Sequence, residues 1–231
     1  MTLQEFQNIV HKLYMGNTDT PDSNTDSWAL RLGFLETSIN MWEHEEGVEW
    51  DELWVRLTNA SDGDKTTDGS HSTLDTPTDF QKPGGFLYLT DSAGQKTWYK
   101  FKKPGAVQLE QIQASSEKYF WVTGNKKVGF TINLSDTPVA GLTVEYPYYK
   151  DAFIPALTTD VLEMSDPFFA VHFTLANLQA LSENGDKASL SLSMANQKLK
   201  SMKVKNAASP AAQEDAAQDY GFSTGTGGFG N

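Results

Sequence analysis

The chain has 231 residues, no cysteine and a net charge of −12, which excludes disulfide bonds and disfavours non-specific binding to nucleic acid. No apolar run approaches the roughly 20 residues of a membrane helix, and the N-terminus lacks a basic leader, so we expect a soluble protein made in the cytoplasm. The charge is uneven: residues 1–57 carry 3 basic and 11 acidic side chains, whereas residues 80–150 carry 9 basic and 5 acidic ones. The sequence therefore predicts a basic segment set into an acidic body.

The first 57 residues show the apolar spacing of two amphipathic helices. Thr2 and Glu5 have the spacing of a capping box, and Gly16 is a candidate C-cap. A second apolar stripe follows in steps of four and three: Trp28, Leu32, Leu35, Ile39 and Trp42. The helical spacing then continues through Trp50, Leu53, Trp54 and Leu57. We expect this last stretch to form a short further helix or a kinked extension of the second one.

An acidic cluster and two tryptophans lie near the end of this part. The cluster consists of Glu43, Glu45, Glu46, Glu49, Asp51 and Glu52. Such a cluster has the residue types of a metal site or a catalytic carboxylate pair, but we interpret it as a solvated face at a helix bend. We interpret Trp50 and Trp54 as core or subunit-contact residues, and name both as subunit-contact candidates.

The middle of the chain changes from helical to strand periodicity. Residues 58–79 contain a single large apolar residue, Leu74, and we expect an exposed loop. Residues 86–89 and 97–101 flank a turn at 91–94, which is typical of a β-hairpin. Further strands are predicted at residues 107–112, 119–122, 130–134 and 142–146. Five or six short strands between residues 80 and 146 predict a small antiparallel β-sandwich or barrel.

The chain then returns to helical periodicity. Residues 147–166 form a return linker, and Asp166-Pro167 is a typical helix start. Two helices are predicted between 167 and 205, the first ending near Asn184-Gly185 and the second capped by Asp186. With two helices on each side of the strands, we expect an α+β fold: a four-helix body, 1–57 and 167–205, with the β-module of residues 80–146 inserted.

Residues 206–231 are of low complexity and predict a flexible tail. Ala, Gly, Ser and Thr dominate, yet three aromatic residues stand out: Tyr220, Phe222 and Phe229. A segment that becomes ordered on a partner uses such residues as anchors, so we name them as candidate partner contacts.

The residues carry no pattern that indicates an enzyme. Residues 225–230 match a dinucleotide-binding fingerprint, but no strand precedes them and only Asn231 follows. The four histidines lie in four different predicted elements, unlike the ligands of a zinc site. We expect neither catalysis nor a metal or cofactor.

The order of elements resembles the head–tail connector (adaptor or neck) proteins of tailed bacteriophages, in particular adaptors that carry a β-domain. The residues that carry the resemblance are 146–149 (YPYY), 157–160 (LTTD) and the Ser-Asp-Pro helix start at 165–167. The resemblance implies a virion structural protein that forms a ring, twelve-fold in the family, beneath the portal. Such a ring extends the DNA channel and joins the head to the neck or tail proteins.

The resemblance also assigns roles to the candidate residues. Tyr220, Phe222 and Phe229 would contact the portal, and the acidic cluster of residues 43–52 would line the channel. Double-stranded DNA would pass without specific binding, because a negative lumen repels phosphate.

Two alternatives stay open. A carbohydrate-binding β-module would use the aromatic residues Trp98, Tyr99, Phe101, Tyr119 and Trp121 as a stacking face. Aromatic residues at alternating strand positions are ordinarily core, which argues against this reading. The other alternative is an enzyme of an unrecognised type.

Overall fold

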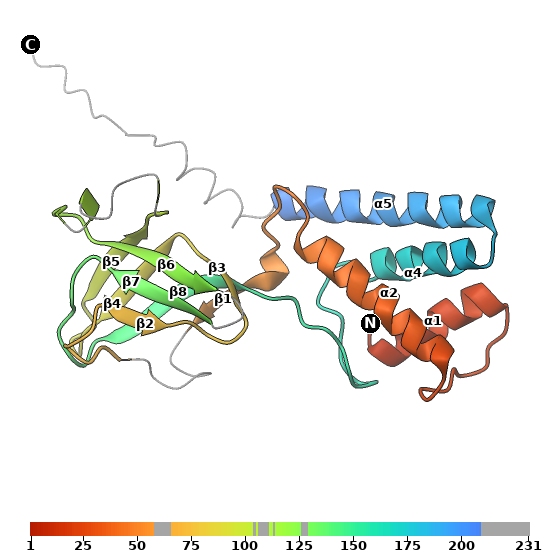
Figure 1. The fold of residues 1–231 in the computed structure, drawn as a ribbon, viewed down its shortest axis with the longest axis horizontal. Coiled ribbons are helices and arrows are strands. Elements are labelled where there is room, and N and C mark those ends of the chain that lie inside the picture. The colour runs from red at the N-terminus through yellow and green to blue at the C-terminus, as the bar shows by residue number, and fades with distance from the viewer. Residues whose placement is uncertain (58–65, 104, 106–110, 113, 126–128, 209–231) are drawn as a thin grey trace, which may run out of the picture. The chain divides into compact units, whose positions relative to one another are not determined.

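A computed structural model of the chain describes residues 1–57, 66–103, 105, 111–112, 114–125 and 129–208. The chain divides into two units, each with many contacts of its own. The first contains Met1–Glu52 and the chain from Ala152 onward, and the second is Leu53–Asp151. The α-helices labelled in Figure 1 belong to the first unit and the strands to the second. We call them the helical unit and the β unit.

The helical unit is built around one central helix. Its helices are α1 (Leu3–Met15), α2 (Asp26–Glu43), α4 (Phe168–Leu181) and α5 (Gly185–Ala207). Helix α4 is apolar on nearly every side, as expected for a helix surrounded by protein, and it contacts α1, α2 and α5. The other three helices each bury one stripe against it.

Local capping rules explain most of the helix ends. The capping box of α1 is present, and Gly16 ends this helix with a left-handed φ of 75°. At the start of α4, the Asp166 side chain accepts a hydrogen bond of 3.2 Å from the Phe168 N–H. Asn184 caps α5 by accepting from the Lys187 N–H, so the predicted cap at Asp186 was wrong. It follows that Asn184 begins the second helix of this pair and does not end the first.

The expected helical extension through Leu57 was also wrong. Asp51–Leu53 form a single 3-10 turn, η1, and Trp54–Leu57 form strand β1. Strand β1 pairs antiparallel with β8 (Thr143–Lys150), with Trp54 opposite Tyr149. Pairing with a strand distant in sequence thus outweighs the helical spacing of the apolar residues.

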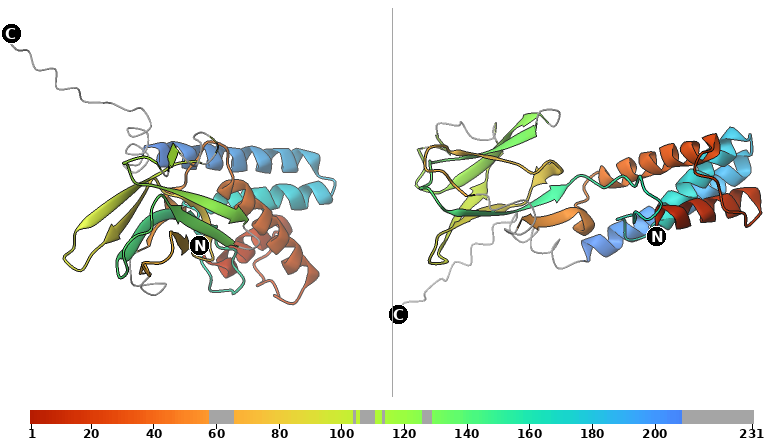
Figure 2. Two further views of the ribbon diagram at one scale, coloured as in Figure 1. Left: turned by 60° about the vertical axis from the view of Figure 1, so that its left-hand side comes forward. Right: turned by 90° about the horizontal axis from the view of Figure 1, so that it is seen from below.

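The β unit is one curled eight-stranded sheet that forms a half-barrel, and not a small antiparallel sandwich. The remaining strands are β2 (Thr73–Asp75), β3 (Phe80–Pro83), β4 (Phe86–Thr90), β5 (Lys96–Phe101), β6 (Tyr119–Asn125) and β7 (Gly129–Leu134). The order is β1-β8-β4-β5-β6-β7-β2, with β3 also paired to β8. Strands β5 and β6 are parallel, so the sheet is mixed. The protein is α+β but richer in strands than the predicted four-helix body with a small insertion, and Figure 2 shows the curl of the sheet.

Strand β8 has more partner strands than any other strand of this sheet. It pairs with β1, β3 and β4, and it runs through Pro147 and ends at Lys150, beyond the predicted end at residue 146. Pro147 lacks an N–H, but its carbonyl accepts from the Gly84 N–H at 2.9 Å. The concave side of the sheet holds the core: Phe80, Leu87, Leu89, Tyr99, Phe120, Ile132, Leu134, Val144, Tyr146 and Tyr148.

Parts of the predicted loop at 58–79 contribute to the sheet. Strand β2 lies within it, and Thr66 forms an isolated bridge with Thr143. Thr67 is buried there and bonds to the backbone of Leu142 and Val139. The predicted strand at residues 107–112 falls largely outside the described residues.

Candidate functional site

The chain between the β unit and α4, residues 152–167, is held in place without helix or strand structure. We call it the return segment. The N-terminus pairs with it: the Leu3 N–H donates to the Asp160 carbonyl at 2.8 Å, and the Leu162 N–H donates to the Met1 carbonyl at 3.1 Å. The Asp160 carboxylate accepts from the N–H groups of Ala156 and Leu157 at 2.9 and 2.7 Å. These bonds fix a loop-like backbone against α1.

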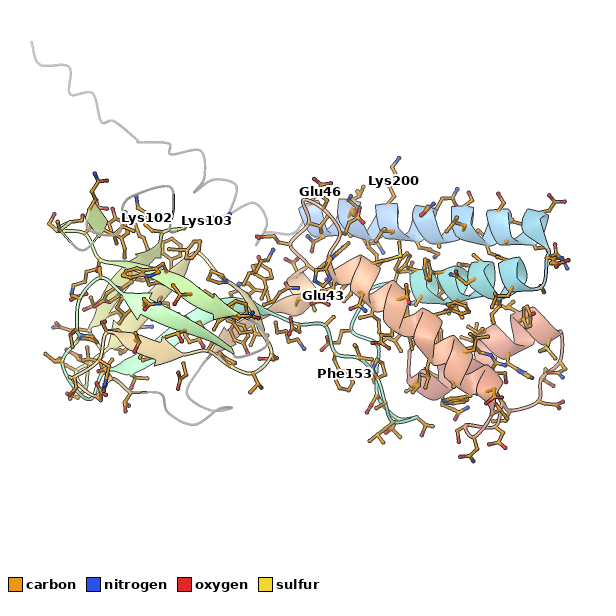
Figure 3. All side chains as sticks on the ribbon, viewed as in Figure 1. Glu43, Glu46, Lys102, Lys103, Phe153 and Lys200 are labelled. Carbon is orange, nitrogen blue, oxygen red and sulfur yellow. The ribbon has the colours of Figure 1, made fainter. Side chains whose placement is uncertain are left out.

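This ordered segment presents apolar side chains to solvent. Phe153, labelled in Figure 3, is 46% exposed, and the others are Ile154 at 44%, Leu157 at 66% and Val161 at 55%. Four apolar side chains on a fixed backbone are typical of a surface that another protein covers. Since the backbone is already bonded, covering them costs little ordering entropy.

Helix α5 presents a second surface of this kind. Its buried residues, Ser191, Ala195 and Met202, form one stripe. Most of the other residues are exposed, among them Leu190, Leu192, Met194 and Val204. The lysines at 187, 200 and 205 make the same exposed surface basic.

The acidic cluster of residues 43–52 is not one continuous solvated face. The side chain of Glu43 is only 5% exposed, and Glu45 forms a 2.6 Å ion pair with Lys203. Asn206 accepts from the Asp51 N–H at 2.9 Å and donates to the Glu49 carbonyl at 2.6 Å. The end of α5 thus fastens the turn that carries these acids. Within the described residues, no group of three or more histidine, aspartate or glutamate side chains is placed to hold a metal ion.

Of the remaining acids in the cluster, Glu46 and Asp51 are exposed. Glu46 is labelled in Figure 3 at the turn after α2. Glu49 is also exposed, while Glu52 is half-buried. Glu43 is buried and is therefore excluded as a channel-lining residue. Glu45 is a poor candidate for that role because it is ion-paired with Lys203.

The two candidate subunit-contact tryptophans have different environments. Trp50 is 1% exposed, its ring lies 5.4 Å from that of Trp42, and its indole N–H donates to the Trp42 carbonyl at 2.5 Å. It belongs to the core of the helical unit and is not available for contact with a second subunit. Trp54 is 45% exposed on β1 and remains a candidate. The tail candidates Tyr220, Phe222 and Phe229 lie outside the described residues.

A half-buried histidine with a shifted pKa lies at the start of α4. Burial lowers the pKa of His172, and repulsion from Lys198 lowers it further against the attraction of Asp166. Lys198 itself forms a 3.0 Å ion pair with Asp166. Because Lys198 and Asp166 are paired with each other, we interpret His172, Lys198 and Asp166 as a structural contact between α4 and α5 rather than an acid–base site.

The five aromatic residues proposed as a stacking face do not share one side of the sheet. Tyr99 is part of the core, with Phe101 packed against it, so neither contributes to an outer surface. Trp98, Tyr119 and Trp121 point to the opposite side by strand alternation. Trp121 is only 5% exposed, whereas Trp98 is 55% exposed.

The convex side of the sheet nevertheless brings aromatic and basic residues together around Trp98. We call this group the outer patch: Phe86, Tyr88, Lys96, Trp98, Lys100, Lys102 and Tyr119. Sequence reasoning identified Trp98 and Tyr119 but missed the lysines. The signal that would have found them is the alternation along β5, where Lys96, Trp98 and Lys100 occupy every second position.

No protein-family model matches the sequence, and a search of curated proteins finds no match. Within the part of the chain that the structure describes, none of the helices combines the length and apolar character needed to cross a bilayer.

Proposed function

We propose that this chain is a structural protein of a tailed-phage virion, a head–tail connector that assembles into a ring beneath the portal. The observation that carries the proposal is the return segment. Its backbone is fixed by hydrogen bonds to the N-terminus and to Asp160, yet it leaves Phe153, Ile154, Leu157 and Val161 exposed. A protein that functions as a component of an assembly buries such a surface against its neighbours.

The charge distribution of the helical unit supports a head-to-tail contact between copies. Helix α5 exposes lysines beside apolar residues, whereas the exposed charged residues of α1, α2 and the turn after α2 are acids apart from Lys12. A heterologous contact between unlike surfaces generates a ring when the rotation between copies closes. Exposed acids that the contact leaves uncovered, with Glu46, Glu49 and Asp51 as candidates, would face the passing DNA and repel it.

The proposal is tested by measuring particle mass with and without the portal protein of the same virus. We expect the full-length chain to form a ring that is visible in negative-stain images, alone or on the portal. Leu157→Asp should reduce ring formation at least tenfold, because it places a charge in the apolar contact. Val139→Asp is the matched control: Val139 is 69% exposed, close to the 66% of Leu157, but it belongs to the β unit and to neither of the surfaces proposed for the contact.

A second arm concerns the tail. A chain ending at Ala208 keeps every described residue, so its melting temperature should match that of the full-length protein. We expect it to bind the portal more weakly, because Tyr220, Phe222 and Phe229 are removed. A wild-type chain that stays monomeric in the presence of the portal would refute the connector proposal.

A second function, carbohydrate binding, is favoured by one observation only. Trp98 is more than half exposed on a rigid sheet, although the five-residue stacking face does not exist. This function would be additional to the connector role.

A further inference from the structure

The indole of Trp98 is presented to solvent in a fixed orientation. Trp98 is the most exposed of the six tryptophans. Its ring lies 5.8 Å from that of Phe86 in an edge-on arrangement and 5.0 Å from that of Tyr88. Both neighbours are on β4, the strand paired with β5. A ring supported in this way is a flat apolar platform that loses little conformational freedom when a ligand covers it.

Lysines flank this platform along the strand. Lys96 lies two positions before Trp98 and Lys100 two positions after it, so all three are on the same side of the sheet. Two positions correspond to about 7 Å along the strand. The Lys96 ammonium lies 4.4 Å from the centre of the Tyr88 ring and 3.5 Å from the Glu145 carboxylate. Lys102 lies 4.8 Å from the centre of the Tyr119 ring. Lys102 and its neighbour Lys103 are labelled in Figure 3.

Two carboxylates also belong to this surface. Glu145 pairs with Lys96, and Glu117 accepts a hydrogen bond from the Tyr119 hydroxyl. This hydrogen bond, together with attraction from Lys100 and Lys102, lowers the pKa of Glu117 below its ordinary value. After these pairings, the three lysines still exceed the two carboxylates by one positive charge.

The mixture of groups distinguishes between the anionic polymers that could bind here. A nucleic acid carries a phosphate at every nucleotide, and its affinity comes from uninterrupted cations and several stacking rings. The two carboxylates interrupt the cations, and Trp98 supplies a single well-exposed platform. A sugar has an apolar C–H face that covers an indole, and hydroxyl groups that donate to carboxylates such as Glu145 and Glu117. The surplus positive charge favours sugars with a negatively charged substituent over neutral sugars.

We propose that the outer patch binds a carboxylate-bearing polysaccharide. One sugar ring lies on Trp98, and its acidic group contacts Lys100 or Lys102. Hydroxyl groups of the same or the neighbouring sugar donate to Glu145 and Glu117. The site is independent of the connector function and of the surfaces of the helical unit.

The test uses the full-length protein with ¹⁵N-labelled tryptophan, which gives six indole signals. Trp98→Phe assigns the signal of Trp98. The probes are hexasaccharides of alginate, polygalacturonate and heparin, with maltohexaose as the neutral control and a twelve-residue oligothymidine as the nucleic-acid control. We expect at least one acidic hexasaccharide to shift the Trp98 signal, and to bind at least tenfold more tightly than either control.

Variants locate the site. Trp98→Ala should weaken binding of that hexasaccharide at least tenfold, and Lys100→Gln should weaken it about threefold to tenfold. Trp54→Ala, at the other exposed tryptophan of the β unit, and Lys187→Gln, on α5, should leave affinity unchanged. Circular dichroism confirms that each variant is folded.

Several results would overturn the proposal. One is the absence of a Trp98 shift with all three acidic hexasaccharides. Tighter binding of oligothymidine would make the patch a nucleic-acid surface, and equal affinity for maltohexaose would remove the role of the acid. An equal loss of affinity in Trp98→Ala and Trp54→Ala would mean that the sugar binds elsewhere.

Discussion

At the scale of single residues, Trp42 and Trp50 show how the helical unit closes over the turn after α2. Both are 1% exposed, and the Trp50 indole donates its hydrogen bond to the carbonyl of Trp42. The contact joins two residues eight positions apart, on either side of Gly47, which takes a left-handed φ of 71°. Trp50 therefore holds the acidic turn against the end of α2.

Replacing Trp50 with alanine should lower the free energy of unfolding of the helical unit by about 3–5 kcal/mol. The change removes a buried aromatic side chain together with its hydrogen bond, and it leaves a cavity beside Trp42. Trp54→Ala should cost less than about 1 kcal/mol, since that side chain is 45% exposed. Urea denaturation followed by circular dichroism measures both, and similar losses in the two variants would contradict the structure.

His172 makes stability depend on pH. Its pKa in the folded protein is lowered from 6.5, first by burial and then by Lys198. The unfolded chain therefore takes up a proton more readily, so the contribution of neutral His172 is complete above pH 6.5 and is lost as the pH falls through its folded-state pKa. When the pH is lowered from about 7.5 to about 5, the free energy of unfolding should fall less for His172→Gln than for the wild type. Equal losses would show that another group causes the dependence.

A nuclear magnetic resonance titration of His172 provides the control. Lys198→Gln removes the repulsion and leaves the attraction of Asp166, so the pKa of His172 should rise. A further fall would mean that the direct effect of Lys198 is outweighed by changes in packing between α4 and α5.

At the scale of elements, two glycines test the packing of the sheet and of a helix. A Cβ atom at Gly84 would lie 2.8 Å from both the carbonyl oxygen and the ring of Pro147, closer than real contacts allow. Gly84 connects β3 to β4 along β8, so this close approach sets the register of three strands. Gly33, in the exposed middle of α2, has no atom within 4 Å of such a Cβ.

We therefore expect opposite effects from the same substitution. Gly84→Ala should destabilise the β unit by about 1–3 kcal/mol, because Pro147 and its strand must move. Gly33→Ala should stabilise the helical unit by about 0.5–1 kcal/mol, through the lower helix propensity of glycine. Thermal melts of the two variants check both signs, and a stable Gly84→Ala protein would mean that β8 shifts without cost.

The elements also show which features can be read from sequence. The caps at Thr2 and Gly16 were predicted because they involve neighbours within four residues. The strand at 54–57 was missed because its partner, β8, lies about 90 residues away in the chain. The parallel pairing of β5 with β6 has no local signal either, since alternation gives the faces of a strand but not its direction or partner.

The same limit applies to the candidate sites. The predicted stacking face combined Trp98 with Tyr99, although strand alternation puts neighbouring residues on opposite sides of β5. The fold then shows that the side of Tyr99 is core. Helical spacing left Trp50 as either a core or a subunit-contact residue, and its burial depends on the turn at Gly47. The exposed side chains of the return segment gave no sequence signal, because apolar residues near prolines occur equally in buried loops.

At the scale of the whole molecule, each unit has its own core. The helical unit is centred on α4, and the β unit on the concave side of its sheet. We expect calorimetry to show two unfolding transitions, one for each unit. Trp50→Ala should lower the transition temperature of the helical unit only, and Gly84→Ala that of the β unit only. A single transition that both variants lower equally would show that the two cores unfold as one.

The order in which the chain is synthesised gives the central position of α4 a further consequence. Helices α1 and α2 leave the ribosome first, then the whole β unit, and only afterwards the helix that covers their apolar stripes. The β unit is therefore complete, and free to fold, while the first two helices still lack their partner. Leu3, Phe6, Val10, Leu35 and Ile39 stay uncovered during that interval, which makes them natural binding sites for a chaperone. The first unit to begin synthesis is the last to fold.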